Sequence, residues 1–289
     1  VRDLCGTLHI WLVKPGRANR PRVDLATDPQ LFGSTSIVVP CHNEEMNVRR
    51  LIDALVQTYD AYIHEIIIVD DNSTDRTAAI VQEAMQAEPR IRLVRRSPPN
   101  GVGRALRDGY AAATGRYVLT MDADFVLLVP ELRDLFECVG AGHDGAIGSR
   151  FSHESVLINY PFVKILCNRA FHLLVKLMLL PHVRDLSNNL KLFRADILKT
   201  LDIEEPHFAA NMETGLKPLL ARYDIKEVPM SWINRTTGMG ASTFRIVGVA
   251  PGYFRGLMRT TWHVWSGRND FRKPAPTAPV ELEPLDDRR

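Results

Sequence analysis

Three short apolar runs rich in β-branched residues each lead into a cluster of polar residues, and this repeated arrangement constrains the fold more than any other feature of the chain. The runs occupy residues 36–39, 65–69 and 117–121, and stretches with apolar residues at helical spacing separate them. Strands that alternate with helices of this length indicate crossover connections. We therefore expect an α/β fold with a mainly parallel, twisted sheet flanked by helices.

The polar clusters follow the carboxyl ends of the predicted strands, which is where parallel sheets bind their ligands. In the third cluster, Asp122 and Asp124 are two positions apart, so their side chains point the same way in an extended chain. Mg²⁺ and Mn²⁺ favour such oxygen ligands and take water and substrate phosphates as well. In the cluster at 70–75, one acid is expected to cap the next helix while another accepts hydrogen bonds from a nucleotide base or ribose.

Charge and cysteine content exclude several classes of protein. The 36 Lys and Arg residues nearly balance the 34 Asp and Glu residues, which argues against a protein that binds nucleic acid through bulk charge. The four cysteines lie far apart without the spacing of a zinc site, and they indicate free thiols in a reducing, cytoplasmic compartment. The sequence contains no uninterrupted apolar stretch of about 18 residues, so we expect no membrane-spanning helix within it.

Two amphipathic stretches occur in the second half of the chain. Residues 163–180 are strongly apolar, and their polar members fall on one basic stripe that contains no acid. Residues 246–273 interleave Lys and Arg with Tyr253, Phe254 and two tryptophans. Both stretches have the composition of helices that lie at a membrane surface, although a core helix also fits the first. We expect peripheral contact with the cytoplasmic face of a membrane.

Five motifs carry a resemblance to a known family. They are PCHNEEMNV, EIIIVDDNSTD, GVGRALRDGYAAATGRYVLTMDADF, IGSRF and KEVPMSWINR, in this order between about residues 36 and 242. Together they resemble the family 2 glycosyltransferases of the GT-A fold. Within that family the chain is similar to dolichyl-phosphate and polyprenyl-phosphate mannosyltransferases and their bacterial relatives. The resemblance implies an enzyme with a GT-A type nucleotide-binding sandwich.

The same resemblance implies a reaction and a set of site residues. The reaction is inverting transfer of a hexose from a nucleoside diphosphate sugar, GDP-mannose or a UDP-sugar, to a polyprenyl phosphate lipid, with Mg²⁺ or Mn²⁺ as cofactor. Asp122 and Asp124 are the expected metal ligands. The implied nucleotide-sugar contacts are Pro40, His42, Glu44, Val69, Asp71, Asp122, Ala123, Asp124, Arg150 and Arg235.

The sequence departs from the family pattern at several positions. His42 stands where the family often has an aromatic residue or Thr, and Val126 stands where a polar residue is common. The closing R-x-x-G-x-S-K motif is two residues longer here and has Thr243 in place of Lys, which removes one cation near the diphosphate. Residues 185–189 replace a more usual D-x-x-S-G-F, so contacts to the sugar and the acceptor are expected to differ.

The difficult step of such a transfer is departure of the diphosphate from the anomeric carbon. A divalent cation would neutralise the growing charge, and Arg150 and Arg235 would donate bidentate hydrogen bonds to phosphate. A lipid phosphate is already an anion at neutral pH and needs no general base. In the alternative, a soluble or glycan hydroxyl is the acceptor and needs a base, for which Asp185 and Glu213 are the candidates. Either residue also fits a structural role. Arg169 and Lys176 are candidates for holding a lipid phosphate.

The resemblance and the composition together divide the chain into four parts. Residues 1–34 form an N-terminal extension, and residues 35–245 form the GT-A glycosyltransferase domain. Residues 246–273 are a basic aromatic segment that fits a membrane interface, and residues 274–289 are a Pro-rich acidic tail with too few apolar residues to pack.

Three other function classes are weaker alternatives. A nucleotide-dependent dehydrogenase is disfavoured because Leu106 replaces the third glycine of its fingerprint and no strand leads directly into the motif. A nucleotidyltransferase would show a Gly-rich, Arg-containing loop after the first strand, where residues 40–44 are instead PCHNE. A non-catalytic nucleotide-binding module is the third, and the intact pair of acids at 122 and 124 argues against it.

Overall fold

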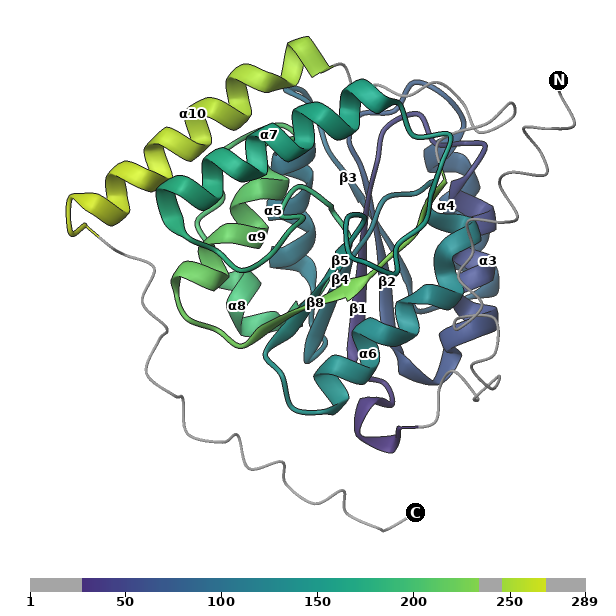
Figure 1. The fold of residues 1–289 in the computed structure, drawn as a ribbon. Coiled ribbons are helices and arrows are strands. Elements are labelled where there is room, and N and C mark those ends of the chain that lie inside the picture. The colour runs from purple at the N-terminus through teal and green to yellow at the C-terminus, as the bar shows by residue number, and fades with distance from the viewer. Residues whose placement is uncertain (1–27, 234–245, 269–289) are drawn as a thin grey trace, which may run out of the picture.

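The computed structural model describes residues 28–233 and 246–268 of the chain (Figure 1). Most of the N-terminal extension, the loop that contains Arg235 and Thr243, and the Pro-rich tail lie outside the described residues, as does the side chain of Val126. The described part forms a seven-stranded sheet covered by helices, which confirms the expected α/β fold.

The sheet has the strand order β3-β2-β1-β4-β7-β5-β8. Strands β3, β2, β1 and β4 are mutually parallel, β5 is parallel to β8, and β7 runs antiparallel to both of its neighbours. The amino end of β7 therefore lies at the same edge as the carboxyl ends of β1, β2 and β4. The bounds are β1 (Thr35–Cys41), β2 (Ile63–Asp70), β3 (Ile91–Arg95), β4 (Tyr117–Thr120), β5 (Gly145–Ser149), β7 (Lys191–Arg194) and β8 (Ile225–Pro229).

Strand β1 continues past the point where the sequence predicts its end. Pro40 lies within the strand and pairs with Val69 of β2. Pairing of β1 with β4 already stops at Val38, so Pro40 has a strand neighbour on one side only. A proline is tolerated there because its missing N–H leaves no ladder hydrogen bond unmade.

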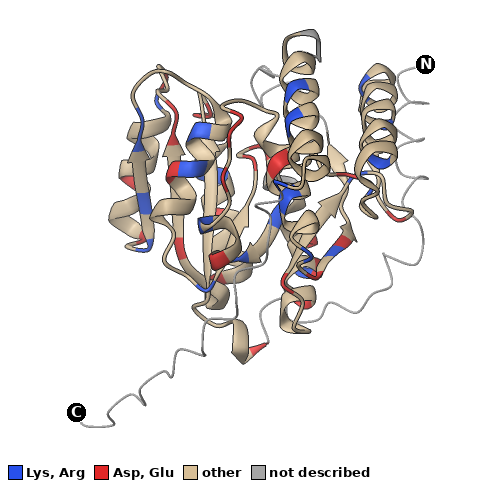
Figure 2. Cartoon of the chain, turned by 90° about the vertical axis from the view of Figure 1, so that its left-hand side faces the viewer, with Lys and Arg blue, Asp and Glu red and all other residues tan. Residues whose placement is uncertain are grey.

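Helices cover both faces of the sheet. Alternate residues of β1 point to opposite faces: Ile37 and Val39 pack under α3, α4 and α6, and Val38 packs under α5 and α8. Figure 2 shows basic and acidic residues mixed over the sheet and most of the helices that cover it, in keeping with the small net charge. The helices are α3 (Val48–Tyr59), α4 (Thr77–Ala87), α5 (Val102–Ala112), α6 (Arg133–Gly140), α8 (Ala195–Lys199) and α9 (Ala210–Leu220), with three 3₁₀ segments, η1 (Pro29–Leu31), η2 (Asp60–Tyr62) and η3 (Phe125–Leu132).

Two long helices, α7 (Phe162–Leu179) and α10 (Ile246–Trp265), lie on the outside of this sandwich (Figure 1). They contact each other and share a small core with α9, in which Val175, Met212 and Leu257 are fully buried. A short sheet of β6 (Leu157–Ile158) and β9 (Trp232–Ile233) lies apart from the main sheet. Over the described ranges, every helix is too short or too polar to cross a bilayer.

The packing of α5 on the sheet predicts a cost for adding one methyl group. A Cβ at Gly109 would lie 2.4 Å from Cγ1 of Val38 and 3.1 Å from Cγ2 of Val69. Gly109→Ala should therefore lower the free energy of unfolding by roughly 1–2 kcal/mol in urea titrations, because overpacking outweighs the better helix propensity of Ala. Gly248→Ala, in the exposed part of α10 with open space around it, is the matched control and should not destabilise. Equal effects at the two positions would contradict this account of α5.

Candidate active site

A cleft of about 330 Å³ opens at the carboxyl edge of the sheet. Among the residues predicted as nucleotide-sugar contacts, eight line this cleft: Pro40, His42, Glu44, Asp71, Asp122, Ala123, Asp124 and Arg150. Val69 instead packs in the core beneath α5, and Arg235 lies outside the described residues. Asp185 and Glu213, the candidate bases, are buried and are not among the lining residues.

The pair of acids after β4 lies in the floor of the cleft. Burial raises the pKa of Asp122 to about 6, and the negative charge of Asp124 adds to the rise. No group of three or more His, Cys, Asp and Glu side chains in the described ranges is arranged to bind a metal. Two carboxylates that repel each other inside a cleft fit a Mg²⁺ or Mn²⁺ ion whose other ligands are water and diphosphate oxygens. The donor set therefore suits the expected cofactor.

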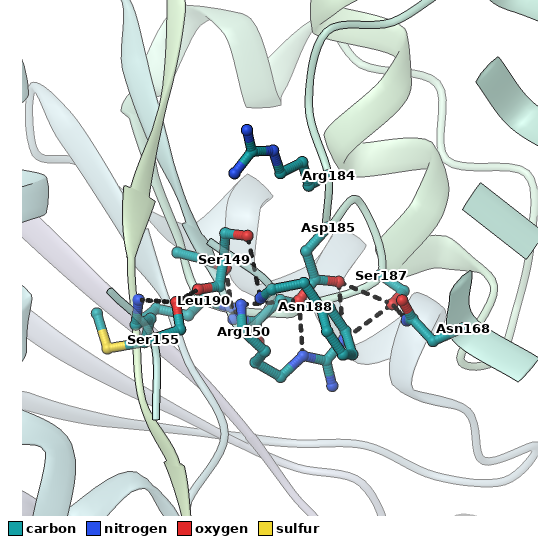
Figure 3. Close-up of polar contacts among 12 residues, drawn as sticks. Ser149, Arg150, Ser155, Asn168, Arg184, Asp185, Ser187, Asn188 and Leu190 are labelled. Atoms are coloured by element: carbon teal, nitrogen blue, oxygen red, sulfur yellow. Dashed lines mark hydrogen bonds and ion pairs between the residues drawn. The ribbon is translucent and has the colours of Figure 1, made fainter. Parts of the chain in front are cut away.

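Arg150 is fixed beside the acids by a buried ion pair (Figure 3). Its Nε donates to Asp185 Oδ2 at 2.7 Å, its Nη2 donates to Oδ1 at 2.9 Å, and its backbone N–H donates to the same carboxylate at 3.1 Å. Burial alone would raise the pKa of Asp185, but the charge and hydrogen bonds of Arg150 outweigh it and hold the pKa well below its usual range. A carboxylate engaged in this way is a poor proton acceptor.

Aromatic rings enclose the outer side of the Arg150 guanidinium. Its Cζ lies 5.5 Å from the ring centroid of Trp232 and 5.9 Å from that of Tyr160, and Nη1 donates to the Tyr160 hydroxyl at 3.3 Å. Such faces stabilise a cation without neutralising it. Arg150 is thus held in one position in the lining of the cleft, with Nε and Nη2 engaged by Asp185 and with Nη1 as the group left to meet an oxyanion such as phosphate.

The loop that leads into β7 connects the ion pair to the acids. Asn189 donates from Nδ2 to Asp122 Oδ1 at 2.7 Å, and Asn188 donates to the carbonyl of Gly148 at 2.6 Å. Lys191 is 1% exposed, and its Nζ donates to the carbonyls of Asn188 and Asn211. These roles are not among those predicted from the sequence, although a lysine between two leucines in a strand indicates an unusual buried position.

At the other end of the cleft, Asp71 organises the loops after β2 and β3. One carboxylate oxygen of Asp71 accepts a hydrogen bond from Arg96, and the other accepts from the backbone N–H of Gly101 at 2.6 Å. Gly101 has φ of +154°, and a Cβ there would lie 2.2 Å from the carbonyl oxygen of Pro206, so only glycine fits. Asp70 accepts from the N–H of Ser73 at 3.0 Å. Asp70 therefore caps the turn after β2, whereas the acid at the start of α4 is Asp75, which accepts from the N–H of Thr77 at 2.9 Å, and Asp71 lines the cleft.

Glu213 has a structural position in α9. One of its carboxylate oxygens accepts hydrogen bonds from the backbone N–H groups of Glu204 and Glu205, at 3.0 and 2.8 Å. The other lies 3.1 Å from both Lys217 Nζ and Arg259 Nη2. These contacts join α9 to α10 and leave Glu213 fully buried behind the wall of the cleft.

The raised pKa of Asp122 predicts that this residue destabilises the metal-free fold. A folded-state pKa of about 6 means that the cost of ionisation is absent below the ordinary pKa of 3.8 and complete above pH 6. Asp122→Asn should therefore raise the free energy of unfolding by on the order of 2–3 kcal/mol at about pH 8 with chelator present, and change it little at about pH 4. Asp53→Asn, at an exposed ion pair, is the control and should shift stability little at either pH. If Asp122→Asn lowered the free energy of unfolding equally at both pH values, the raised pKa of Asp122 would be refuted.

The buried pair predicts strong coupling between its two members. Asp185→Asn and Arg150→Gln should each cost about 3–5 kcal/mol of unfolding free energy, because each leaves an uncompensated buried charge. The double variant should cost less than the sum, with a coupling of on the order of 3 kcal/mol in a double-mutant cycle. Additive losses would mean that the pair contributes no specific interaction.

Known proteins resemble this chain in fold and in sequence. Glucosyl-3-phosphoglycerate synthase from Mycobacterium tuberculosis, solved in complex with Mn²⁺, UDP and glucosyl-3-phosphoglycerate, matches with a TM-score of 0.60 at 21% identity over 86% of each chain. The same enzyme in complex with phosphoglyceric acid matches with a TM-score of 0.62 at 20% identity over 86% of each chain. At this identity the likeness concerns the fold alone.

Among sequence relatives, a dolichol-phosphate mannosyltransferase of Pyrococcus furiosus is 28% identical over 70% of this chain and 57% of its own length. Glycosyltransferase AglD of Haloferax volcanii is 26% identical over 79% of this chain and 37% of its own length. A polyprenol monophosphomannose synthase of Mycolicibacterium smegmatis is 26% identical over 71% of this chain and 79% of its own length. The chain thus spans little more than half the length of the Pyrococcus relative and little more than a third of the length of the Haloferax relative. The model of glycosyl transferase family 2 matches residues 36–202, more than half of the chain, and the protein therefore belongs to this family.

Proposed function

We propose that the protein transfers a hexose from a nucleoside diphosphate sugar to a polyprenyl phosphate lipid, with inversion at the anomeric carbon and with Mg²⁺ or Mn²⁺ bound by Asp122 and Asp124. Family membership supports a glycosyltransferase and replaces the nucleotidyltransferase and binding-module alternatives. The names of two sequence relatives support a polyprenol-type acceptor. We also propose peripheral contact with the cytoplasmic face of a membrane, in keeping with free thiols at Cys41, Cys138 and Cys167.

One observation carries the choice of acceptor. A second cavity of about 300 Å³ lies between α7 and α10, with Phe171 and Phe254 in its wall. It shares lining residues with the cleft, among them Arg150 and Lys164. The basic residues Arg150 and Lys164 thus lie where the cleft meets the second cavity, and aromatic and aliphatic side chains line the rest of that cavity. This arrangement matches a molecule with a phosphate at one end and an apolar tail at the other.

The residues of the cleft have distinct tasks in this reaction. The bound cation would neutralise the charge of the departing diphosphate. Asp122 and Asp124 would hold the cation, and Asn189 keeps one oxygen of Asp122 in place. Arg150 would donate to phosphate through Nη1, and Asp185, which holds Nε and Nη2, acts through Arg150 as a positioning residue.

The contacts of the two candidate bases argue against the alternative with a hydroxyl acceptor. Asp185 is engaged by Arg150, and Glu213 is engaged by Lys217 and Arg259 behind the cleft wall. A phosphate acceptor needs neither residue as a base, because it is already an anion. Arg169 donates to the carbonyl of Arg184, and Lys176 lines neither cavity, so Lys164 replaces them as the proposed partner of a lipid phosphate.

The assay that tests this function measures release of nucleoside diphosphate. The full chain with Mg²⁺ or Mn²⁺ should release it from one member of a panel of GDP- and UDP-sugars only when polyprenyl phosphate is present. Polyprenol without the phosphate is the matched control and should give no release. Asp124→Asn should abolish release while the far-ultraviolet circular dichroism stays unchanged. Release that depends instead on a soluble sugar acceptor would overturn the proposal in favour of the hydroxyl mechanism.

A further inference from the structure

Helix α7 turns two polar side chains, His172 and Asn168, toward the protein and leaves several large apolar side chains exposed to solvent, although Val175 packs in the core shared with α9. His172 is 7% exposed, and its Nε2 accepts a hydrogen bond from the N–H of Leu186 at 2.8 Å. Asn168 donates to the Ser187 hydroxyl at 2.9 Å. Leu177, in contrast, is 71% exposed. A helix at a protein–water boundary normally has the opposite arrangement.

The exposed apolar side chains concentrate on α7 and its neighbour α10. The described residues expose twelve large apolar side chains, and nine of them belong to these two helices or to the residue that ends α7. We call these nine the α7–α10 face. Its members are Phe162, Val163, Leu166, Leu173, Leu177, Leu180, Phe254, Trp262 and Trp265. The two helices are in contact, and the ring of Phe171 packs on that of Tyr253 with 5.2 Å between centroids.

The charges of the two helices distinguish between possible partners of this face. Neither α7 nor α10 contains an Asp or a Glu, whereas Lys176 and Arg255 are both exposed on them. A second copy of the chain would bring basic helices against basic helices. An anionic lipid surface complements them, and tryptophans such as Trp262 and Trp265 suit its headgroup layer.

The position of the face relative to the cavities points to the same partner. The cavity between α7 and α10 includes Phe254, which is also a member of the face, and leads inward to Arg150. Under the proposed function, on which this step rests, an acceptor with a long apolar tail has to reach Arg150 from a lipid phase. A cavity that opened toward water would expose that tail.

We propose that the α7–α10 face docks on an anionic phospholipid bilayer, with its apolar side chains inserted among the headgroups and the cavity between the helices open toward the lipid. Burial of each large apolar side chain favours the docked state, and the basic residues add attraction to anionic lipids. The reversed orientation of α7 is a consequence of this role. Its residues Asn168 and His172 contact the loop before β7, and its exposed apolar residues insert into the bilayer.

Vesicle sedimentation with the full chain tests the docking. The chain should sediment with phosphatidylcholine vesicles that contain phosphatidylglycerol, and less with phosphatidylcholine alone. Leu173→Glu and Leu177→Glu should each reduce the partition coefficient at least about tenfold, because each exchanges an inserted apolar group for a charge. Met85→Glu replaces an exposed apolar residue on α4, away from the face, and should bind as the unchanged chain does. Equal binding by all three variants, or none by the unchanged chain, would overturn the proposal.

Two further measurements separate this proposal from the proposed function and from self-association. With a short, water-soluble prenyl phosphate and no vesicles, Leu177→Glu should turn over as fast as the unchanged chain. Loss of vesicle binding with retained turnover supports the docking role, whereas absence of turnover in every variant concerns the reaction alone. Light scattering should find the same mass for the unchanged chain and for Leu177→Glu. A dimer that this substitution dissociates would show that a second copy covers the face, and would overturn the bilayer assignment.

Discussion

The buried pair of Arg150 and Asp185 determines how the cleft is built. Arg150 follows β5, and Asp185 lies in the loop between α7 and β7, so the pair joins two segments that are 35 residues apart in the chain. Without Asp185, the guanidinium would be a desolvated charge among aromatic rings, which is a costly state. With it, Arg150 has a single position and the loop before β7 is held against the end of β5.

The antiparallel strand β7 makes this arrangement possible. In a purely parallel sheet the residues before a strand lie at the edge opposite to the ligand site. Because β7 runs the other way, the residues before it reach the carboxyl end of β4, and Asn189 contacts Asp122. Lys191 anchors this loop at its far end through two backbone carbonyls. The site thus depends on one reversed strand and on the polar groups that fix its approach.

The sequence was sufficient for features that repeat locally and insufficient for those that join distant segments. Alternating strands and helices and the paired acids after β4 follow from short-range patterns, and the cleft position of Arg150 was implied by the resemblance to family 2 glycosyltransferases. The engagement of Asp185 and Glu213 does not, since Arg150 is 35 residues from Asp185 and Arg259 belongs to α10, and a free carboxylate and a paired one look alike in sequence. The polar stripe of α7 was found from its spacing, but periodicity defines a face without saying whether that face meets water or protein.

The contacts of Glu213 reach further than α9 itself. Glu213 holds Arg259 of α10 and the backbone of Glu204 and Glu205 at once, and Pro206, next in the chain, accepts hydrogen bonds from the N–H groups of Gly103 and Arg104 at the start of α5. His207 and Phe208 then line the cleft. A displacement of α10 would therefore shift His207 and Phe208, so that the outermost helix is mechanically coupled to the wall of the cleft.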